Sequence, residues 1–185
     1  MNTLFDRRDY PYVQMTPIEW SEMLLDSYSA YFDVQRCAPG GEFYATMAYH
    51  ARDEKYVLTQ SAKLWAAESH EYAYLISCDH LTLEAARALT DRAMEAGMGQ
   101  IHPHPEHMQS RITVLFVCGS ADADALRFVR RFSKSKAFRF SLYGWMQGRA
   151  VCLVCEEGRV YAGYHGRDVR KFIQKRLKAA KAAAN

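Results

Sequence analysis

The sequence predicts an α/β protein, of mixed α+β character, in which helices cover both faces of a single mixed sheet. Two observations carry this prediction. Amphipathic segments with capping residues alternate with apolar runs of strand length, and the first three strand-like runs are joined by short polar connectors. Such connectors favour a three-stranded antiparallel meander, whereas the helices between the later runs make the sheet mixed. The expected order is α-β-β-β-α-β-α-β-β-α.

The domain organisation follows from the absence of a linker. No Pro-, Gly- or Ser-rich tract interrupts the 185 residues, and every expected loop is short. Residues 1–185 are therefore expected to form one globular domain, a normal size for a single core. The alanine-rich end, residues 179–185, is expected to fray.

The first helix is expected within residues 16–32, TPIEWSEMLLDSYSAYF. Thr16 is its N-cap, Pro17 occupies the first helical position, and Glu19 completes a capping box with Thr16. The apolar residues of this segment form one broad face.

The remaining elements are read from apolar runs and from the helix-ending and turn residues between them. The meander comprises residues 42–50, 55–67 and 71–78. A helix then begins after Thr82 and stops at Gly97, with Gly97 and Gly99 as cap residues. The rest of the chain is expected as a strand at 110–119, a helix at 120–136, two or three strands within 138–163, and a helix at 166–184.

Composition indicates a folded, reduced and cytoplasmic protein. Hydrophobic residues make up 49% of the chain, enough for a substantial core, and no apolar run is long enough to span a bilayer. The first residues, MNTLFDRRDYPYVQ, lack the apolar stretch of a secretory signal, so we expect no membrane association. The five cysteines are expected as free thiols. CLVC at 152–155 lies in a strand, where positions i and i+3 face opposite sides.

The charge is divided unevenly along the chain. Residues 1–119 carry 9 Lys/Arg and 16 Asp/Glu (9 − 16 = −7), whereas residues 120–185 carry 15 and 5 (15 − 5 = +10). Such asymmetry points to an acidic partner, either nucleic acid or an acidic protein surface, or to a homodimer in which the two halves meet. The candidate binding residues are Arg127, Arg130, Arg131, Lys134, Arg170, Lys171, Lys175 and Arg176, with Arg130 and Lys134 expected one turn apart on a helix.

The stretch GMGQIHPHPEHMQSR, residues 97–111, is the candidate metal site. Its prolines favour an extended chain, in which His102 and His104 project to one side with Cα atoms about 7 Å apart. Glu106 or His107 would add a third ligand for Zn, Ni or Fe, leaving a position for water as in catalytic sites. The alternative is a polar connector between a helix and a strand. His80 would join the site only if the fold brings it close.

The α-β-β-β-α-β order of residues 17–118 resembles the restriction-endonuclease-like core of the PD-(D/E)xK nucleases. In that family, carboxylates on two meander strands hold Mg²⁺ beside the scissile phosphate. Here residues 55–67 contain no carboxylate, and Glu71 is followed at the lysine position by Ala73. The resemblance therefore concerns element order alone, and no family is assigned.

The sequence leads to two function hypotheses. The first is a non-enzymatic binding or interaction domain that contacts an acidic partner through its basic C-terminal half. The second is a divalent-metal-dependent hydrolase centred on His102, His104 and His107.

Overall fold

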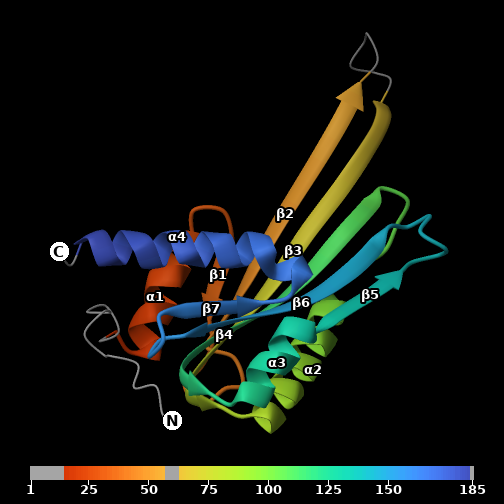
Figure 1. Ribbon diagram of the computed structural model, residues 1–185. Coiled ribbons are helices and arrows are strands. Elements are labelled where there is room, and N and C mark those ends of the chain that lie inside the picture. Colours follow the sequence, from red (N-terminus) through yellow and green to blue (C-terminus); the bar gives the residue numbers. More distant parts are fainter. Residues whose placement is uncertain (1–14, 57–62, 184–185) are drawn as a thin grey trace.

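The computed structural model of the protein describes residues 15–56 and 63–183. It confirms the predicted class, because a mixed sheet of seven strands is combined with four α-helices in the expected order (Figure 1). The elements are α1 (Pro17–Tyr28), β1 (Asp33–Arg36), β2 (Ala45–Tyr56), β3 (Lys63–Leu81), α2 (Leu83–Gln100), β4 (His107–Ala121), α3 (Ala123–Arg131), β5 (Ser133–Ala137), β6 (Trp145–Val154), β7 (Arg159–Ala162), the short 3₁₀ helix η3 (Tyr164–Gly166) and α4 (Arg167–Ala183).

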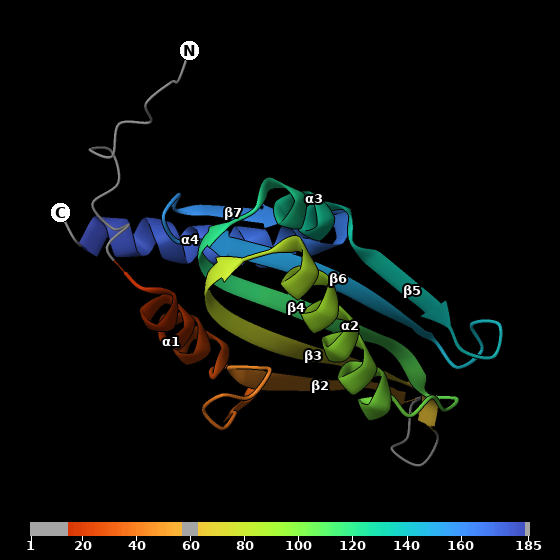
Figure 2. The ribbon, with the colours of Figure 1, turned by 90° about the horizontal axis from the view of Figure 1, so that it is seen from below.

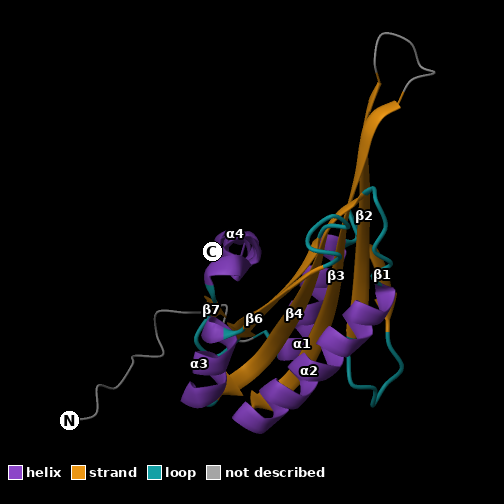
Figure 3. Cartoon of the chain, turned by 90° about the vertical axis from the view of Figure 1, so that its right-hand side faces the viewer, coloured by secondary structure: helices purple, strands orange, loops and turns teal. Residues whose placement is uncertain are grey.

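The sheet combines an antiparallel half with a parallel centre. Its strand order is β1-β2-β3-β4-β6-β5, and β7 also pairs with β6. β1, β2 and β3 form the predicted antiparallel meander, while β3, β4 and β6 run parallel because α2 and α3 provide the crossovers. The paired ends of β2 and β3 extend beyond the rest of the sheet (Figure 3).

Each face of the sheet has its own core. On one face α2 and α3 pack over side chains such as Tyr74, Ile112 and Phe116. On the other face α1 and α4 pack over a second set that includes Leu75, Leu115 and Val151. Figure 2 shows α2 and α3 in front of the sheet and α4 behind it. The later parts of β4 and β6 are covered on both faces, which explains why residues 112–118 and 150–154 are almost continuously apolar.

The local helix signals are confirmed. Thr16 and Glu19 form the capping box at the start of α1, with Pro17 at the first helical position. The Thr82 hydroxyl likewise caps α2 by accepting a hydrogen bond from the Ala85 backbone N–H. The strand bounds of the meander were predicted wrongly. The first run, 42–50, falls on β2, which continues through residues 51–56, and residues 63–67 form one strand, β3, with the third run, while β1 was not expected. Within the second run, residues 57–62 lie outside the described residues.

Two helix boundaries were predicted wrongly. α2 continues past Gly97 to Gln100, so Gly97 does not cap the helix. Its lack of a side chain instead lets α2 pack closely against Ile112 of β4. α3 ends at Arg131 rather than 136, since Ser133–Ala137 pair with β6 as an edge strand. The expectation that Arg130 and Lys134 share a helix face is therefore wrong. The predicted tail residues 179–183 belong to the last turns of α4.

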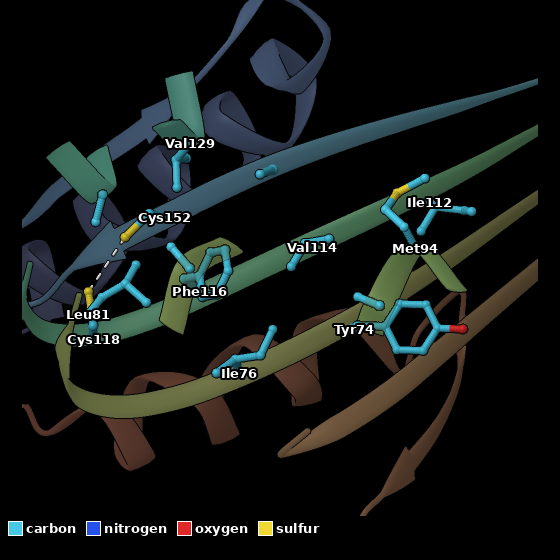
Figure 4. Close-up of a cluster of buried hydrophobic side chains, with 14 of the residues drawn as sticks. Tyr74, Ile76, Leu81, Met94, Ile112, Val114, Phe116, Cys118, Val129 and Cys152 are labelled. Carbon is cyan, nitrogen blue, oxygen red and sulfur yellow. Dashed lines mark hydrogen bonds between the residues drawn. The ribbon is translucent and has the colours of Figure 1, made fainter. Parts of the chain in front are cut away.

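The cysteines lie where strand geometry places them. Cys152 belongs to the core under α2 and α3, and Cys155 to the core under α1 and α4. All five cysteines are free, and the sulfurs of Cys118 and Cys152 lie 3.5 Å apart (Figure 4). The expectation that the thiols of CLVC face opposite sides agrees with this arrangement.

In the described part of the chain, no helix is both long and apolar enough to cross a membrane.

Candidate functional site

A pocket of about 440 Å³ opens on the face of the sheet that α1 and α4 cover. Its walls come from the end of α1, from β2 and from the first turns of α4. Its floor is polar and comes from β3, β6 and α4. We call it the α1–α4 pocket; it is lined by Ser27, Tyr28, Tyr31, Phe32, Tyr49, Glu71, Arg149, Asp168, Val169 and Phe172.

Three neighbouring strands contribute to the floor of the α1–α4 pocket and to the polar layer directly beneath it. Glu71 on β3, Thr113 on β4 and Arg149 on β6 point to the same face as the second core, since each lies an even number of residues from a side chain of that core. Thr113 and Arg149 are direct partners in the parallel pairing of β4 with β6. The polar floor is thus a continuation of the apolar core along the same three strands.

The Arg149 guanidinium is the centre of this floor. Its side chain is 3% exposed. Nη2 donates to Glu71 Oε1 at 2.7 Å, and Nε donates to the Thr113 hydroxyl at 2.8 Å. Nη1 donates to Asp168 Oδ1 at 2.7 Å and to the His165 carbonyl at 3.0 Å. The Thr113 hydroxyl in turn donates to Glu71, which joins all three strands in one network.

The charges of the floor support one another. Burial disfavours the charged guanidinium, but the attraction of Glu71 and the bonds to Asp168 outweigh it, so the pKa of Arg149 is raised. For Asp168, burial acts to raise the pKa, and the Arg149 hydrogen bonds more than offset this, so that the pKa is lowered. Burial, and next the charge of Glu71, raise the pKa of the Tyr28 hydroxyl. The raised pKa of Arg149 and the lowered pKa of Asp168 keep both partners of this ion pair charged at neutral pH.

The walls of the α1–α4 pocket are aromatic. Tyr28 makes edge contacts with Phe32 and Phe172, at ring-centroid distances of 5.0 and 5.1 Å. Phe32 also contacts Tyr49, at 5.5 Å, and Tyr31 stands at the mouth with 78% of its surface exposed. Outside this wall, the Arg176 guanidinium lies over the Phe172 ring at 5.3 Å. The arrangement can hold a flat or apolar group between rings and present charged groups beneath it.

Residues 102–107, which we call the histidine loop, lie beside strands β2 and β3, neighbours that the sequence did not predict. His104 and His107 lie near His70 on β3 and His50 on β2, and we call these four residues the histidine cluster. His50 Nδ1 and His70 Nδ1 share a hydrogen bond of 2.8 Å, and the rings of His70 and His107 stack at 6.0 Å. The rings of His104 and His107 lie 6.3 Å apart. The structure thus brings together His104 and His107, whereas His102 is exposed.

The polar atoms of the histidine cluster already contact protein groups. His107 is buried, with Nδ1 2.7 Å from the Tyr143 carbonyl and Nε2 2.9 Å from the Ser110 hydroxyl. His104 Nε2 lies 3.0 Å from Glu68 Oε2. Arg52 pairs with both Glu68 and Glu106.

Across the described ranges, 15–56 and 63–183, no group of three or more His, Cys, Asp or Glu side chains is arranged to hold a metal ion. Binding of Zn, Ni or Fe by His102, His104, Glu106 and His107 therefore stays a prediction, which metal analysis of the purified protein would test. His80 lies at the opposite ends of β3 and β4, where it contacts Ser120 and Asp122. It cannot join the histidine loop.

The predicted basic residues fall into two groups on opposite faces of the sheet. Arg127, Arg130 and Arg131 belong to α3, and Lys134 to the fully exposed edge strand β5. Arg170, Lys171, Lys175 and Arg176 belong to α4, which packs on the other face through Val169 and Ile173. Of the α3 group, Arg127 pairs with Asp124 at 2.6 Å.

Sequence reasoning missed the α1–α4 pocket altogether. A signal was present, because Arg149 is the one charged residue within the strand WMQGRAVCLV, and Glu71 opens an apolar run. A charged residue in a strand buried on both faces requires a partner. The sequence does not name that partner, since Asp168 and Glu71 come from other elements.

Comparison with known proteins gives one match. The model of a protein family described as a domain of unknown function (DUF8052) matches residues 17–175. No curated protein and no solved structure matches the chain. The matched span runs from the start of α1 into α4 and includes every residue that lines the α1–α4 pocket.

Proposed function

The chain belongs to the family described as a domain of unknown function (DUF8052), and from its geometry we propose that it is a non-enzymatic binding domain that takes a small organic molecule in the α1–α4 pocket. The pocket volume of about 440 Å³ falls in the usual range for such sites. Its lining combines aromatic walls with a few fixed polar groups, which is the composition that small-molecule sites share.

One observation carries the proposal: a guanidinium that is 3% exposed lies at the base of an open pocket between two carboxylates. Removing a charged group from water costs several kcal/mol, and a buried ion pair often stabilises less than apolar residues of the same volume. The ion pairs of Arg149 with Glu71 and Asp168 therefore stabilise the fold less than apolar residues of the same volume would. Fixed charges beneath aromatic walls do, however, orient a ligand.

Backbone amide NMR spectra of the protein, recorded with a library of small aromatic compounds, test this proposal. We expect shifts at Tyr31, Tyr49 and Val169. Ser27→Trp fills the pocket and should abolish them, whereas Ala30→Trp, on the exposed side of the same helix end, should leave them unchanged. No shifts with any compound, or shifts that survive Ser27→Trp, would refute a binding role for this pocket.

A second candidate function is contact with an acidic partner through α3 and β5. Residues 125–155 contain seven Lys/Arg and no Asp/Glu. Every residue of β5 is exposed, and Lys134 and Lys136 project to the same side of it because they are two positions apart. An edge strand that carries lysines is also protected from pairing with other strands, which is the alternative explanation.

Titration with a fluorescent DNA duplex and with a single strand, at several salt concentrations, tests the second candidate. Binding through several phosphates must weaken steeply with salt. Lys134→Glu with Lys136→Glu should remove the binding, and Lys175→Glu on α4 should have a smaller effect, because it lies on the other face. A binding constant that does not change with salt excludes nucleic acid as the partner.

A further inference from the structure

Given a ligand site in the α1–α4 pocket, on which this inference rests, we propose that the ligand is a small organic cation, an amine or a quaternary ammonium with an apolar substituent. Two features of the pocket lead to this class, the balance of charge on its floor and the nature of its walls, and the position of Arg176 provides a way to test it.

The floor carries more negative than positive charge. Glu71 and Asp168 face a single guanidinium, that of Arg149, within the lining. Nε, Nη1 and Nη2 of that guanidinium each donate to a protein oxygen, and the side chain is only 3% exposed, so an anionic ligand can make little contact with it. Asp168, in contrast, is 59% exposed and can face a second cation without moving away from Arg149.

The walls favour the same class of ligand. The faces of aromatic rings carry negative potential and attract a cation that lies within about 6 Å of the ring centroid. The lining contains Tyr28, Tyr31, Phe32, Tyr49 and Phe172, contributed by α1 and the turn after it, by β2 and by α4. Rings on several sides of a cation, with a carboxylate below, form the arrangement that recognises ammonium groups.

Arg176 shows that this wall already accepts a cation. Its guanidinium lies 5.3 Å from the centroid of Phe172, on a side chain that reaches out from α4 into solvent. It is not part of the pocket lining, but it contributes positive charge beside it. An organic cation in the pocket would be repelled by Arg176, whereas an anion would be attracted.

This opposite response provides the decisive experiment, isothermal titration of the full chain with three compounds of similar size. Benzyltrimethylammonium is the cation, benzoate the anion and benzyl alcohol the neutral compound. We expect the cation to bind at least tenfold more tightly than the other two. Arg176→Gln should strengthen its binding severalfold, and Asp168→Asn should weaken it about tenfold.

The controls separate failure of this inference from failure of the proposed function. Thermal melting of each variant establishes that it is folded, and Tyr164→Ser, an exposed aromatic residue of η3 outside the pocket, should leave binding unchanged. If benzoate binds more tightly than the cation, or if Arg176→Gln weakens cation binding, the cation inference is wrong while the binding pocket stands. If none of the three compounds binds and the library gives no shifts, the proposed function is wrong as well.

Discussion

The Arg149 guanidinium lies 2.7 Å from Oδ1 of Asp168, and this contact ties strand β6 to the first turn of α4. Asp168 is 59% exposed whereas Arg149 is 3% exposed, so the contact spans the boundary between core and solvent. On its buried side the same guanidinium reaches Glu71, 78 residues away in sequence. One side chain therefore links two strands of the sheet with the helix that closes the second core.

We predict that Arg149→Met destabilises the protein by about 3–5 kcal/mol. Loss of the guanidinium leaves Glu71 partly buried without its cation, and an unpaired buried charge costs this much. Urea denaturation measures the change. Arg127→Met is the matched control, since its ion pair with Asp124 is exposed on both sides and should contribute at most about 1 kcal/mol. Equal losses for the two variants would show that the buried network does not stabilise the fold.

Two glycines of α2 should respond to alanine in opposite directions. A Cβ at Gly97 would lie 2.8 Å from Ile112 Cδ1, in the packed contact between α2 and β4, whereas at Gly99 it would meet nothing within 4 Å. Gly97→Ala should therefore cost about 1–3 kcal/mol through overpacking. Gly99→Ala should stabilise by about 0.5–1 kcal/mol, because alanine is the better helix former. Thermal unfolding of both variants tests this, and stabilisation by Gly97→Ala would show that Ile112 can move aside.

The thiols should differ sharply in reactivity. Burial raises the pKa of Cys78 and of Cys155 to about 12 in each case, and Cys118 and Cys152 are fully buried. The thiolate is the reactive form, so these four thiols should react slowly at pH 8. Cys37 lies outside both cores and is partly exposed. Titration with Ellman's reagent should show one fast-reacting thiol, which Cys37→Ser removes. Two or more fast-reacting thiols in the native protein would contradict the burial of the other four.

The features that the sequence predicts correctly depend on residues close together in the chain. Thr16, Pro17 and Glu19 act within one helical turn, and Thr82 caps α2 through a residue three positions away, so their spacing alone determines their role. The end of α3 was missed because pairing of Ser133–Ala137 with β6 prevails over helix propensity. Residues 133–136, Ser-Lys-Ser-Lys, are all polar and show no alternation of apolar and polar residues, so the sequence carried no pattern typical of a strand there.

What the sequence could not predict depends on pairing between distant strands. The histidine loop meets His70 and Glu68 because β3 and β4 are parallel neighbours in that register. A sequence gives neither the neighbour nor the register of a parallel pair, because the connection passes through a helix. Glu71, Arg149 and Asp168 form one site for the same reason, and only the charge inside the apolar strand β6 hinted at it.

The histidine cluster should make the stability of the protein fall as the pH drops below neutral. Burial, and next the charge of His50, lower the pKa of His70. The groups that face it are His50, His104 and His107 and, as an opposing influence, Glu68, which is in turn paired with Arg52. His70 binds a proton less readily in the folded protein than in the unfolded chain. Its contribution to the free energy of unfolding is therefore fully present above the ordinary histidine pKa of about 6.5. It is lost as the pH falls from that value through the lowered pKa of His70 in the folded protein.

Urea denaturation at pH 8, 7, 6 and 5 measures this loss, and His70→Gln is the informative variant. Protonating both His50 and His70 must break the hydrogen bond between their Nδ1 atoms, whereas glutamine cannot be charged. The variant should therefore lose less stability than the parent between pH 7 and 5, even if it is less stable at pH 8. His80→Gln is the control, because His80 lies at the far end of β3 and pairs with Asp122 on the surface. Asp168 does not contribute to the change in stability between pH 7 and 5. Its pKa is lowered, so the stability that its carboxylate provides is lost only at more acidic pH. If His70→Gln shows the same slope as the parent, titration of the cluster does not control the stability.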